Sequence, residues 1–141
     1  MIKLADTPPA KDCNTYKNDY DEISHCPYSG ESDYWVGALV TCKEMGGHLP
    51  DMTELANIAK AVYPSIAGSI SAYSSYQSAS WNTTEVAKLG GSPGGFVLWS
   101  SEEYSITSIG SRIRYFRSNE TNGDTNYGRS EPIKFICLAN N

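Results

Sequence analysis

The sequence predicts a single α+β domain that is tied by disulfide bonds. Segments with helical periodicity lie in the first half of the chain, strand candidates lie in the second half, and four cysteines are spread over both. The 141 residues suit one domain, and an apolar share of 40% is enough for its core. A net charge of -5 without a run of Lys or Arg argues against nucleic acid as a partner.

The N-terminal region, residues 1–34, is rich in Pro, Asn, Asp and Ser, so we expect loops with a local disulfide and little regular structure. Residues 35–141 form the main domain, and the two parts together make one compact unit. The first residues do not resemble a signal peptide, and no run is apolar enough to insert into a membrane. For an exported protein, we expect that a targeting or anchoring segment was cleaved or lies outside this sequence.

The four cysteines are even in number and lack the C-x-x-C spacing of zinc sites, which favours disulfides. Of the three possible connectivities, we expect a local Cys13–Cys26 bond and a long-range Cys42–Cys137 bond. The long-range bond would contribute about 3 to 5 kcal/mol in the chain-entropy model. Polar, loop-rich chains of this kind are typical of secreted proteins, which predicts an extracellular or cell-surface location. The alternative is four buried thiols in a cytosolic protein.

Two helices are predicted before Pro64. In the first, residues 35–45, one face carries Trp35, Ala38, Leu39, Cys42 and Met45. Gly46 and Gly47 supply the positive φ angles that end this helix. The second helix begins at Asp51, which forms a capping box with Glu54, and it ends before Pro64. Its buried stripe is Leu55, Ile58, Ala59 and Val62.

The second half of the chain is predicted to hold loops and three strands. Residues 65–95 are rich in Ser, Gly, Ala and Tyr without a sustained period, so we expect long loops with at most short strands. The strand candidates are 96–100, 112–117 and 133–138. In the last of them Phe135 and Cys137 share one face, which suits a bond to Cys42 on the buried face of the first helix. That bond would bring the two termini close together.

Four runs, 35–42, 45–50, 98–101 and 135–138, resemble those of bacterial C-type-lectin-like domains. The resemblance implies a C-type-lectin-like fold with two helices and a small twisted antiparallel sheet. Sugar-binding members of that family hold calcium with motifs of Glu-Pro-Asn and Trp-Asn-Asp type. Here Glu131-Pro132-Ile133 and Trp81-Asn82-Thr83 each lack one ligand and stand in the wrong order. We therefore expect no bound metal and no cofactor.

A second resemblance is to variable proteins diversified by retroelements, in which a lectin-like scaffold is constant and adenine-templated codons are mutated. It depends on Gly94-Gly95, Trp99, the run 108–112 and the cysteine-bearing last strand. Residues 118–128, which we expect to form an inserted loop, depart from this resemblance. The scaffold residues that it implies are Trp99, Gly110, Ser111, Arg112 and Cys137. The exposed, ligand-binding positions that it implies are Ser101, Tyr104, Ser105, Thr107, Tyr115, Ser118, Asn119, Asn122, Asp124, Asn126 and Tyr127.

The composition of residues 100–130 favours recognition over catalysis. These 31 residues include seven Ser, three Thr, three Asn and three Tyr, a mixture that gives antibody paratopes rigid contact area and adaptable hydrogen bonds. His25 and His48 are predicted to be structural or solvent-facing. Glu102 and Glu103 are predicted to be solvated surface. We expect no catalytic residues.

These observations predict an extracellular binding or adhesion module, not an enzyme, that captures a protein or cell-surface ligand, for example at a pilus tip. Tyr104, Tyr115 and Tyr127 would be its anchors. Two alternatives stay open. One is a calcium-dependent carbohydrate lectin that uses Glu120, Asp124 and Glu131. The other is a structural subunit of a pilus or fibre, whose Tyr-rich loops pack against neighbouring subunits.

Overall fold

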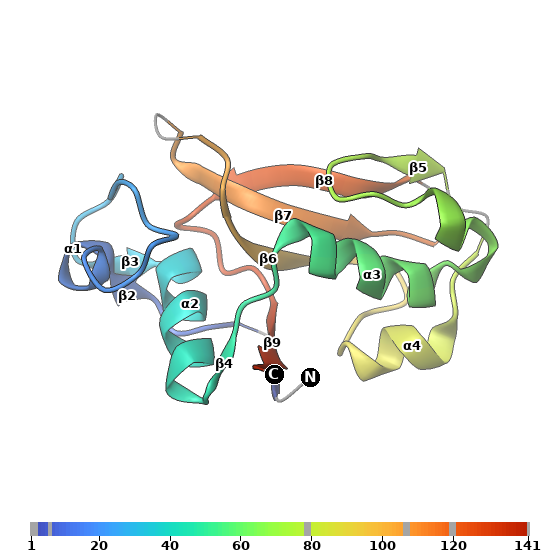
Figure 1. Ribbon diagram of the computed structural model, residues 1–141, viewed down its shortest axis with the longest axis horizontal. Helices are drawn as coiled ribbons and strands as arrows, with labels where there is room; N and C mark the ends of the chain where they lie inside the picture. Colours follow the sequence, from blue (N-terminus) through green and yellow to red (C-terminus); the bar gives the residue numbers. More distant parts are fainter. Residues whose placement is uncertain (1–2, 6, 78–79, 106–107, 119–120, 141) are drawn as a thin grey trace.

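The computed structural model describes residues 3–5, 7–77, 80–105, 108–118 and 121–140, and it confirms an α+β architecture with two disulfides. The elements, with η1 a 3-10 helix, are β1 (Lys3–Ala5), β2 (Lys11–Asp12), α1 (Cys13–Tyr16), β3 (Glu31–Asp33), α2 (Tyr34–Glu44), β4 (Gly47–His48), α3 (Met52–Val62), η1 (Pro64–Ser69), β5 (Tyr76–Gln77), α4 (Thr83–Lys88), β6 (Phe96–Glu103), β7 (Gly110–Phe116), β8 (Thr121–Gly128) and β9 (Phe135–Ala139). In Figure 1, β9 lies between α2 on one side and α3 with α4 on the other, and β7 and β8 cross the top.

Helix α2 begins at the cap that Asp33 provides by accepting a hydrogen bond from the Val36 amide. Gly46, with φ of 79°, follows the helix as predicted, whereas Gly47 starts β4. The predicted stripe is buried except for Met45, whose side chain is 43% exposed. Including Met45 in the stripe was wrong because the helix ends at Glu44 and Met45 is the residue that follows it.

Helix α3 begins with the predicted capping box. The Asp51 carboxylate accepts from the Glu54 amide, and the Glu54 carboxylate accepts from the Asp51 amide. Within the predicted stripe Leu55, Ala59 and Val62 are buried, and Ile58 is only partly buried. The helix stops at Val62, and Pro64 opens η1.

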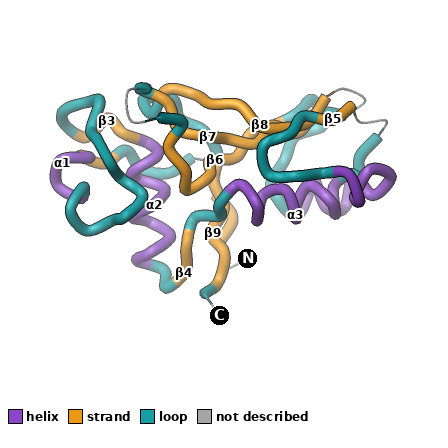
Figure 2. Tube along the Cα trace, turned by 45° about the horizontal axis from the view of Figure 1, so that its top comes forward, coloured by secondary structure: helices purple, strands orange, loops and turns teal. Residues whose placement is uncertain are grey.

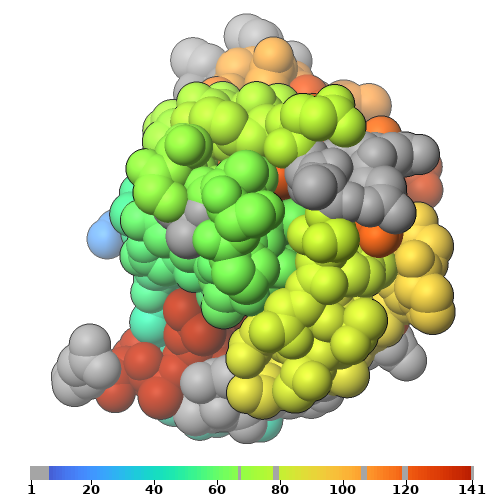
Figure 3. All heavy atoms as spheres, turned by 90° about the vertical axis from the view of Figure 1, so that its right-hand side faces the viewer, coloured from blue at the N-terminus to red at the C-terminus, as the bar shows by residue number. Residues whose placement is uncertain are grey.

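The segment 65–95 contains more regular structure than predicted. Beside the short strand β5 it holds most of η1 and all of α4, so the expectation of loops with at most short strands was wrong. Helix α4 has only six residues, too few to show an apolar period, and the Asn82 side chain caps it by accepting from the amides of Thr84 and Glu85. Figure 3 shows the side of the molecule that α3, residues 70–77 and α4 build.

The main sheet is antiparallel, with strands in the order β5-β8-β7-β6. β7 pairs with β8 in continuous register from Gly110 opposite Gly128 to Tyr115 opposite Gly123. The prediction that 118–128 is an inserted loop was therefore wrong, because 121–128 forms a strand between β5 and β7. Polar side chains of β8 bond to arginines of β7 instead of packing in an apolar core, so no apolar alternation marks this strand.

A smaller sheet, β1-β9-β4, joins the two ends of the chain. Lys3 of β1 lies opposite Cys137 of β9, which confirms that the termini are close together (Figure 1). Figure 2 shows the same arrangement after rotation, with β4 and β9 between α2 and α3. No helix in the described part of the chain is long and apolar enough to cross a membrane.

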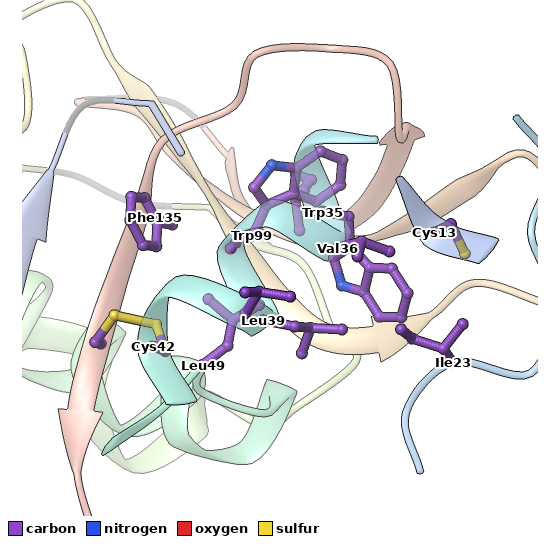
Figure 4. Close-up of a cluster of buried hydrophobic side chains, with 13 residues drawn as sticks. Cys13, Ile23, Trp35, Val36, Leu39, Cys42, Leu49, Trp99 and Phe135 are labelled. Atoms are coloured by element: carbon purple, nitrogen blue, oxygen red, sulfur yellow. A yellow bond between two sulfur atoms is a disulfide. The ribbon is translucent and has the colours of Figure 1, made fainter. Parts of the chain in front are cut away.

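Two apolar clusters occupy opposite faces of the central strands. Alternation along β6 sends Trp99 into the cluster around α2 and Leu98 into the cluster around α3. β7 divides in the same way between Ile113 and Phe116. Figure 4 shows the α2 cluster, where Trp99 lies among side chains from α2 and β9. Burying each such side chain contributes about 1.5–3 kcal/mol, so these clusters hold the helices against the sheet.

Both predicted disulfides are confirmed. Cys13 bonds to Cys26 with a Cα–Cα distance of 5.6 Å, and Cys42 bonds to Cys137 with a Cα–Cα distance of 5.2 Å. The second bond joins α2 to β9 inside the α2 cluster. The bonds therefore anchor the N-terminal region locally and connect the first long helix to the last strand.

Candidate functional site

Four of the predicted binding residues line one hollow in the main sheet. The hollow has a volume of about 450 Å³ and is lined by Tyr115, Arg117, Asp124, Thr125, Asn126 and Tyr127. The last four residues are consecutive on β8, which lies at the end of the molecule opposite the two termini (Figure 1). The fold thus brings Tyr115, Asp124, Asn126 and Tyr127 to one place.

Arg112 connects this hollow to a fifth predicted residue, Tyr104. Its Nη1 donates to both carboxylate oxygens of Asp124, at 2.9 and 3.1 Å. The guanidinium also lies 4.7 Å from the ring centroid of Tyr73 and 5.1 Å from that of Tyr104. Cation–π attraction at these distances holds both rings, although Tyr73 is 56% exposed and Tyr104 is 47% exposed. Arg112 therefore fixes side chains that themselves remain open to a ligand.

Tyr73 is a surface residue that sequence reasoning missed. Its hydroxyl donates a hydrogen bond to the Glu102 carboxylate, and this bond raises the pKa of Tyr73 above its ordinary value. The other oxygen of Glu102 accepts from the Met52 amide at the start of α3. The only signal in the sequence was the Tyr content of residues 65–95, because no motif or period marks the position.

Asn122 is not part of the exposed surface, and the prediction that it is exposed was wrong. Its side chain is fully buried, with Oδ1 accepting from Arg114 at 3.2 Å and Nδ2 donating to the Tyr76 carbonyl at 3.1 Å. Arg114 is also fully buried, and burial lowers the pKa of its guanidinium. Asn122 accepts a hydrogen bond from one N–H group of the buried Arg114 guanidinium, so Asn122 is a structural residue.

Arg114 also determines the path of residues 71–75. Its Nη2 donates to the carbonyls of Ser71, Ala72 and Ser74, at 2.8, 3.2 and 3.4 Å. The segment then passes so close to β8 that a Cβ atom on Gly123 would lie 2.3 Å from Ser75 Oγ. A glycine is therefore required at this crossing, and the bond from the Tyr115 hydroxyl to Ser75 Oγ adds to the contact.

The remaining predicted binding residues lie outside the hollow. Ser101, Ser105 and Ser118 are half-buried, and the Ser101 amide donates to the Pro50 carbonyl. Thr107 and Asn119 lie outside the described residues. The scaffold positions Trp99, Gly110, Ser111 and Cys137 are all buried, and Arg112 is half-buried.

Glu103 belongs to a polar network instead of the solvated surface, so that expectation was wrong. Its side chain is only 9% exposed and pairs with His25 Nδ1 while accepting from the amide and hydroxyl of Ser24. His25 Nε2 contacts the Ser108 carbonyl at 2.7 Å. The network ties the N-terminal region to the loop between β6 and β7. Sequence spacing could not reveal it, because its members are far apart in the chain.

The groups named for calcium binding are not gathered at one point. Asp124 is bonded to Arg112, Glu131 is exposed in the turn after β8, and Glu120 lies outside the described residues. Within the described ranges, no group of three or more His, Cys, Asp or Glu side chains is placed to hold a metal ion. His48 bonds to Glu54 and Asn140, at 2.8 and 2.7 Å, so both of its ring nitrogens are occupied.

Comparison with known proteins gives no relative. No family model, no curated protein and no solved structure matches this chain.

Proposed function

We propose that the domain is an extracellular binding module that captures a protein or cell-surface ligand. The site is the β7–β8 surface, defined as Tyr73, Tyr104, Arg112, Tyr115, Asp124, Asn126 and Tyr127. It extends around the β8 edge, because strand alternation places Arg112, Asp124 and Asn126 on one face of the sheet and Tyr115 and Tyr127 on the other. The observation that carries the proposal is the position of Arg112 between two exposed tyrosine rings and the Asp124 carboxylate, beside a hollow lined by two further tyrosines. This arrangement supplies aromatic contact area that is already ordered before a ligand binds.

Pre-ordering matters because binding normally costs the entropy of immobilised side chains. Tyr73 is held by Glu102 and Arg112, and Tyr115 is held by Ser75 and by the Arg117 guanidinium 4.8 Å from its ring centroid. Rigid aromatic rings of this kind are common among residues that dominate binding energy. The charge of Arg112 is balanced by Asp124, so recognition depends on shape and hydrogen bonding more than on net charge.

The position of the surface and the character of the scaffold support the same function. A segment joined at either terminus would leave β8 free, because the termini lie at the opposite end (Figure 1). Two disulfides are typical of proteins that work outside the cell. In chain order α2 and α3 precede the strands β6, β7 and β8 of the main sheet, and β1 pairs with β9. This arrangement supports the C-type-lectin-like fold that we propose.

The retroelement resemblance gives a ligand-free test with an internal control. Asn122 and Asn126 are the same residue type on one strand, but only Asn126 lines the hollow and Asn122 is fully buried. Sequencing the locus from many isolates should show changes at Tyr104, Asn126 and Tyr127, while Asn122 and Arg114 stay constant. Equal substitution at Asn122 and Asn126 would remove the support for a diversified binding face.

The binding function itself is tested with the purified domain and an array of extracellular proteins. Tyr127→Ala should reduce binding to any captured protein at least tenfold without lowering the melting temperature, because the side chain is 41% exposed. Met45→Ala is the matched control, since Met45 is 43% exposed but lies after α2, outside the surface. Equal loss in both variants, or none in Tyr127→Ala and Tyr104→Ala, would contradict the proposal.

A further inference from the structure

Among the residues that the structure describes, the outer edge of β8 is unpaired along most of its length. β5 pairs with β8 only at Gln77 opposite Thr121 and Tyr76 opposite Asn122. Beyond Asn122, no strand in the described part of the chain pairs with β8 on the side away from β7. Residues 124–127 therefore form an edge, and the same four residues line the hollow of about 450 Å³.

The hydrogen bonds around β7 show which backbone groups point outward at this edge. The Trp99 amide donates to the Lys134 carbonyl, so it points away from β7. Trp99 lies opposite Ile113 of β7, and the two residues therefore form a non-hydrogen-bonded pair of the antiparallel ladder. By alternation, Ile113 directs its amide and carbonyl to Thr125 of β8. Neighbouring residues on a strand point their backbone groups in opposite directions. Asp124 and Asn126 consequently present their amides and carbonyls to the open side.

Two other bonds agree with this direction. The Arg129 amide donates to the Ile109 carbonyl. Arg129 is thus another odd-numbered residue, like Thr125, whose amide points to the β7 side. Ser100 Oγ donates to the Arg112 carbonyl, so that carbonyl faces β6 and not Asn126, the residue opposite Arg112 on β8.

The fold keeps this edge open. Residues 71–75 precede β5 and would continue its pairing along β8 if they stayed extended beside that strand. Instead, the carbonyls of Ser71, Ala72 and Ser74 turn to the buried Arg114, and Ser75 crosses at Gly123. The usual protections of an exposed edge are also missing from 124–127. The segment has no Lys or Pro, its register with β7 has no bulge, and Arg112 balances the charge of Asp124.

We propose that the ligand of the β7–β8 surface is a protein segment in extended conformation, which adds to β8 as a new edge strand. This proposal rests on the proposed binding function and specifies the chemical class of its ligand. The segment would bond to the amides and carbonyls of Asp124 and Asn126, and its side chains on one face would enter the hollow beside Tyr115, Arg117 and Tyr127. Backbone bonds supply affinity in this mode, and the hollow selects among side chains.

The probe is a display library of random linear dodecapeptides, selected on the intact chain alone, and the enriched peptides are then compared on an Asn126→Pro chain. Proline at 126 removes an outward amide and keeps the β7–β8 ladder, because that ladder does not use the Asn126 amide. Asn126→Ala is the matched control, which removes the side chain and keeps the amide. Synthetic copies of the enriched peptides should bind Asn126→Pro at least tenfold more weakly than Asn126→Ala.

Amide hydrogen exchange of the unmodified chain gives a readout that does not depend on either variant folding. In the free chain the amides of Asp124 and Asn126 should exchange quickly, whereas that of Thr125 is protected by β7. A saturating peptide should slow exchange at Asp124 and Asn126 and leave Thr125 unchanged. Failure to enrich any peptide, or equal binding to both variants with no change in exchange, would overturn strand addition.

Other outcomes separate this proposal from the function on which it rests. If Tyr127→Ala loses the array ligand but Asn126→Pro does not, the surface binds its ligand by side chains alone and strand addition is wrong. If neither variant affects binding, both proposals are wrong. A chain that sediments as a dimer, and becomes monomeric as Asn126→Pro, would show that a second copy occupies the edge and would overturn an external ligand segment.

Discussion

Arg129 and Asp33 form a fully buried ion pair, with Nη2 and Oδ2 2.9 Å apart. The pair joins the residue after β8 to the residue that caps α2. Arg129 also donates to the His25 carbonyl at 3.2 Å and lies 4.4 Å above the Trp35 ring. Burial raises the pKa of Asp33, and the Arg129 guanidinium and the Val36 amide oppose that shift. The N-terminal region is therefore fixed to the main sheet by a charge pair, while the Cys13–Cys26 bond closes a loop within that region.

Replacing Asp33 with Asn should destabilise the domain strongly. The substitution keeps the side-chain shape but removes the closer anionic partner of the buried Arg129 guanidinium and leaves the Glu103 carboxylate, whose Oε2 lies 3.8 Å from Nη1. Breaking a buried ion pair costs about 3–5 kcal/mol in comparable cases. The free energy of unfolding from urea titration measures the effect. Glu85→Gln is the control, because its pair with Lys88 is solvent-exposed and should change stability by less than about 0.5 kcal/mol. A loss below about 1 kcal/mol for Asp33→Asn would show that the pair adds little.

Replacing Arg114 with Met should release residues 71–75 from the sheet. The substitution retains much of the side-chain volume but removes the donors that satisfy the carbonyls of Ser71, Ala72 and Ser74. An unsatisfied buried acceptor costs about 1–3 kcal/mol, and the segment can avoid this cost by opening to water. Amide exchange over 71–77 should accelerate at least tenfold. Lys60→Met, on the exposed side of α3, is the control, and equal acceleration in both variants would contradict this role of Arg114.

The features that the sequence predicted correctly are those with a local or periodic signal. The capping box of Asp51 and Glu54 is defined within four residues, and both disulfides follow from the number and placement of the cysteines. Each of these depends on residue types that have few alternative explanations. The same reasoning placed the strands around Trp99, Ile113 and Cys137, because apolar residues there alternate or cluster.

The features that the sequence did not predict depend on contacts between distant polar residues. β8 lacks apolar alternation because Asp124 and Asn122 bond to Arg112 and Arg114, so no pattern on the strand itself revealed it. The misplacement of Asn122 has the same cause. A buried arginine hydrogen-bonded to neutral oxygens has no sequence signature, and an Asn that serves it resembles a surface Asn.

The bond between His48 and Glu54 predicts a pH dependence of stability. Glu54 raises the pKa of His48 above its ordinary value of 6.5, the Asn140 amide oxygen assists, and partial burial opposes the shift. A raised folded-state pKa means that the folded chain binds the proton more tightly than the unfolded chain does. The stabilisation is therefore fully present below about pH 6.5 and is lost as pH rises through the folded-state pKa.

The comparison that isolates this effect is the difference in free energy of unfolding between the native chain and His48→Gln, measured from pH 5.5 to 8.5. The difference should be largest at the acidic end and fall toward zero, because all other titrating groups are common to both chains. Its size should stay below about 1 kcal/mol and shrink in high salt, since the two side chains are 37% and 34% exposed. A difference that is constant or grows with pH would mean that protonated His48 does not stabilise the junction between β4 and α3.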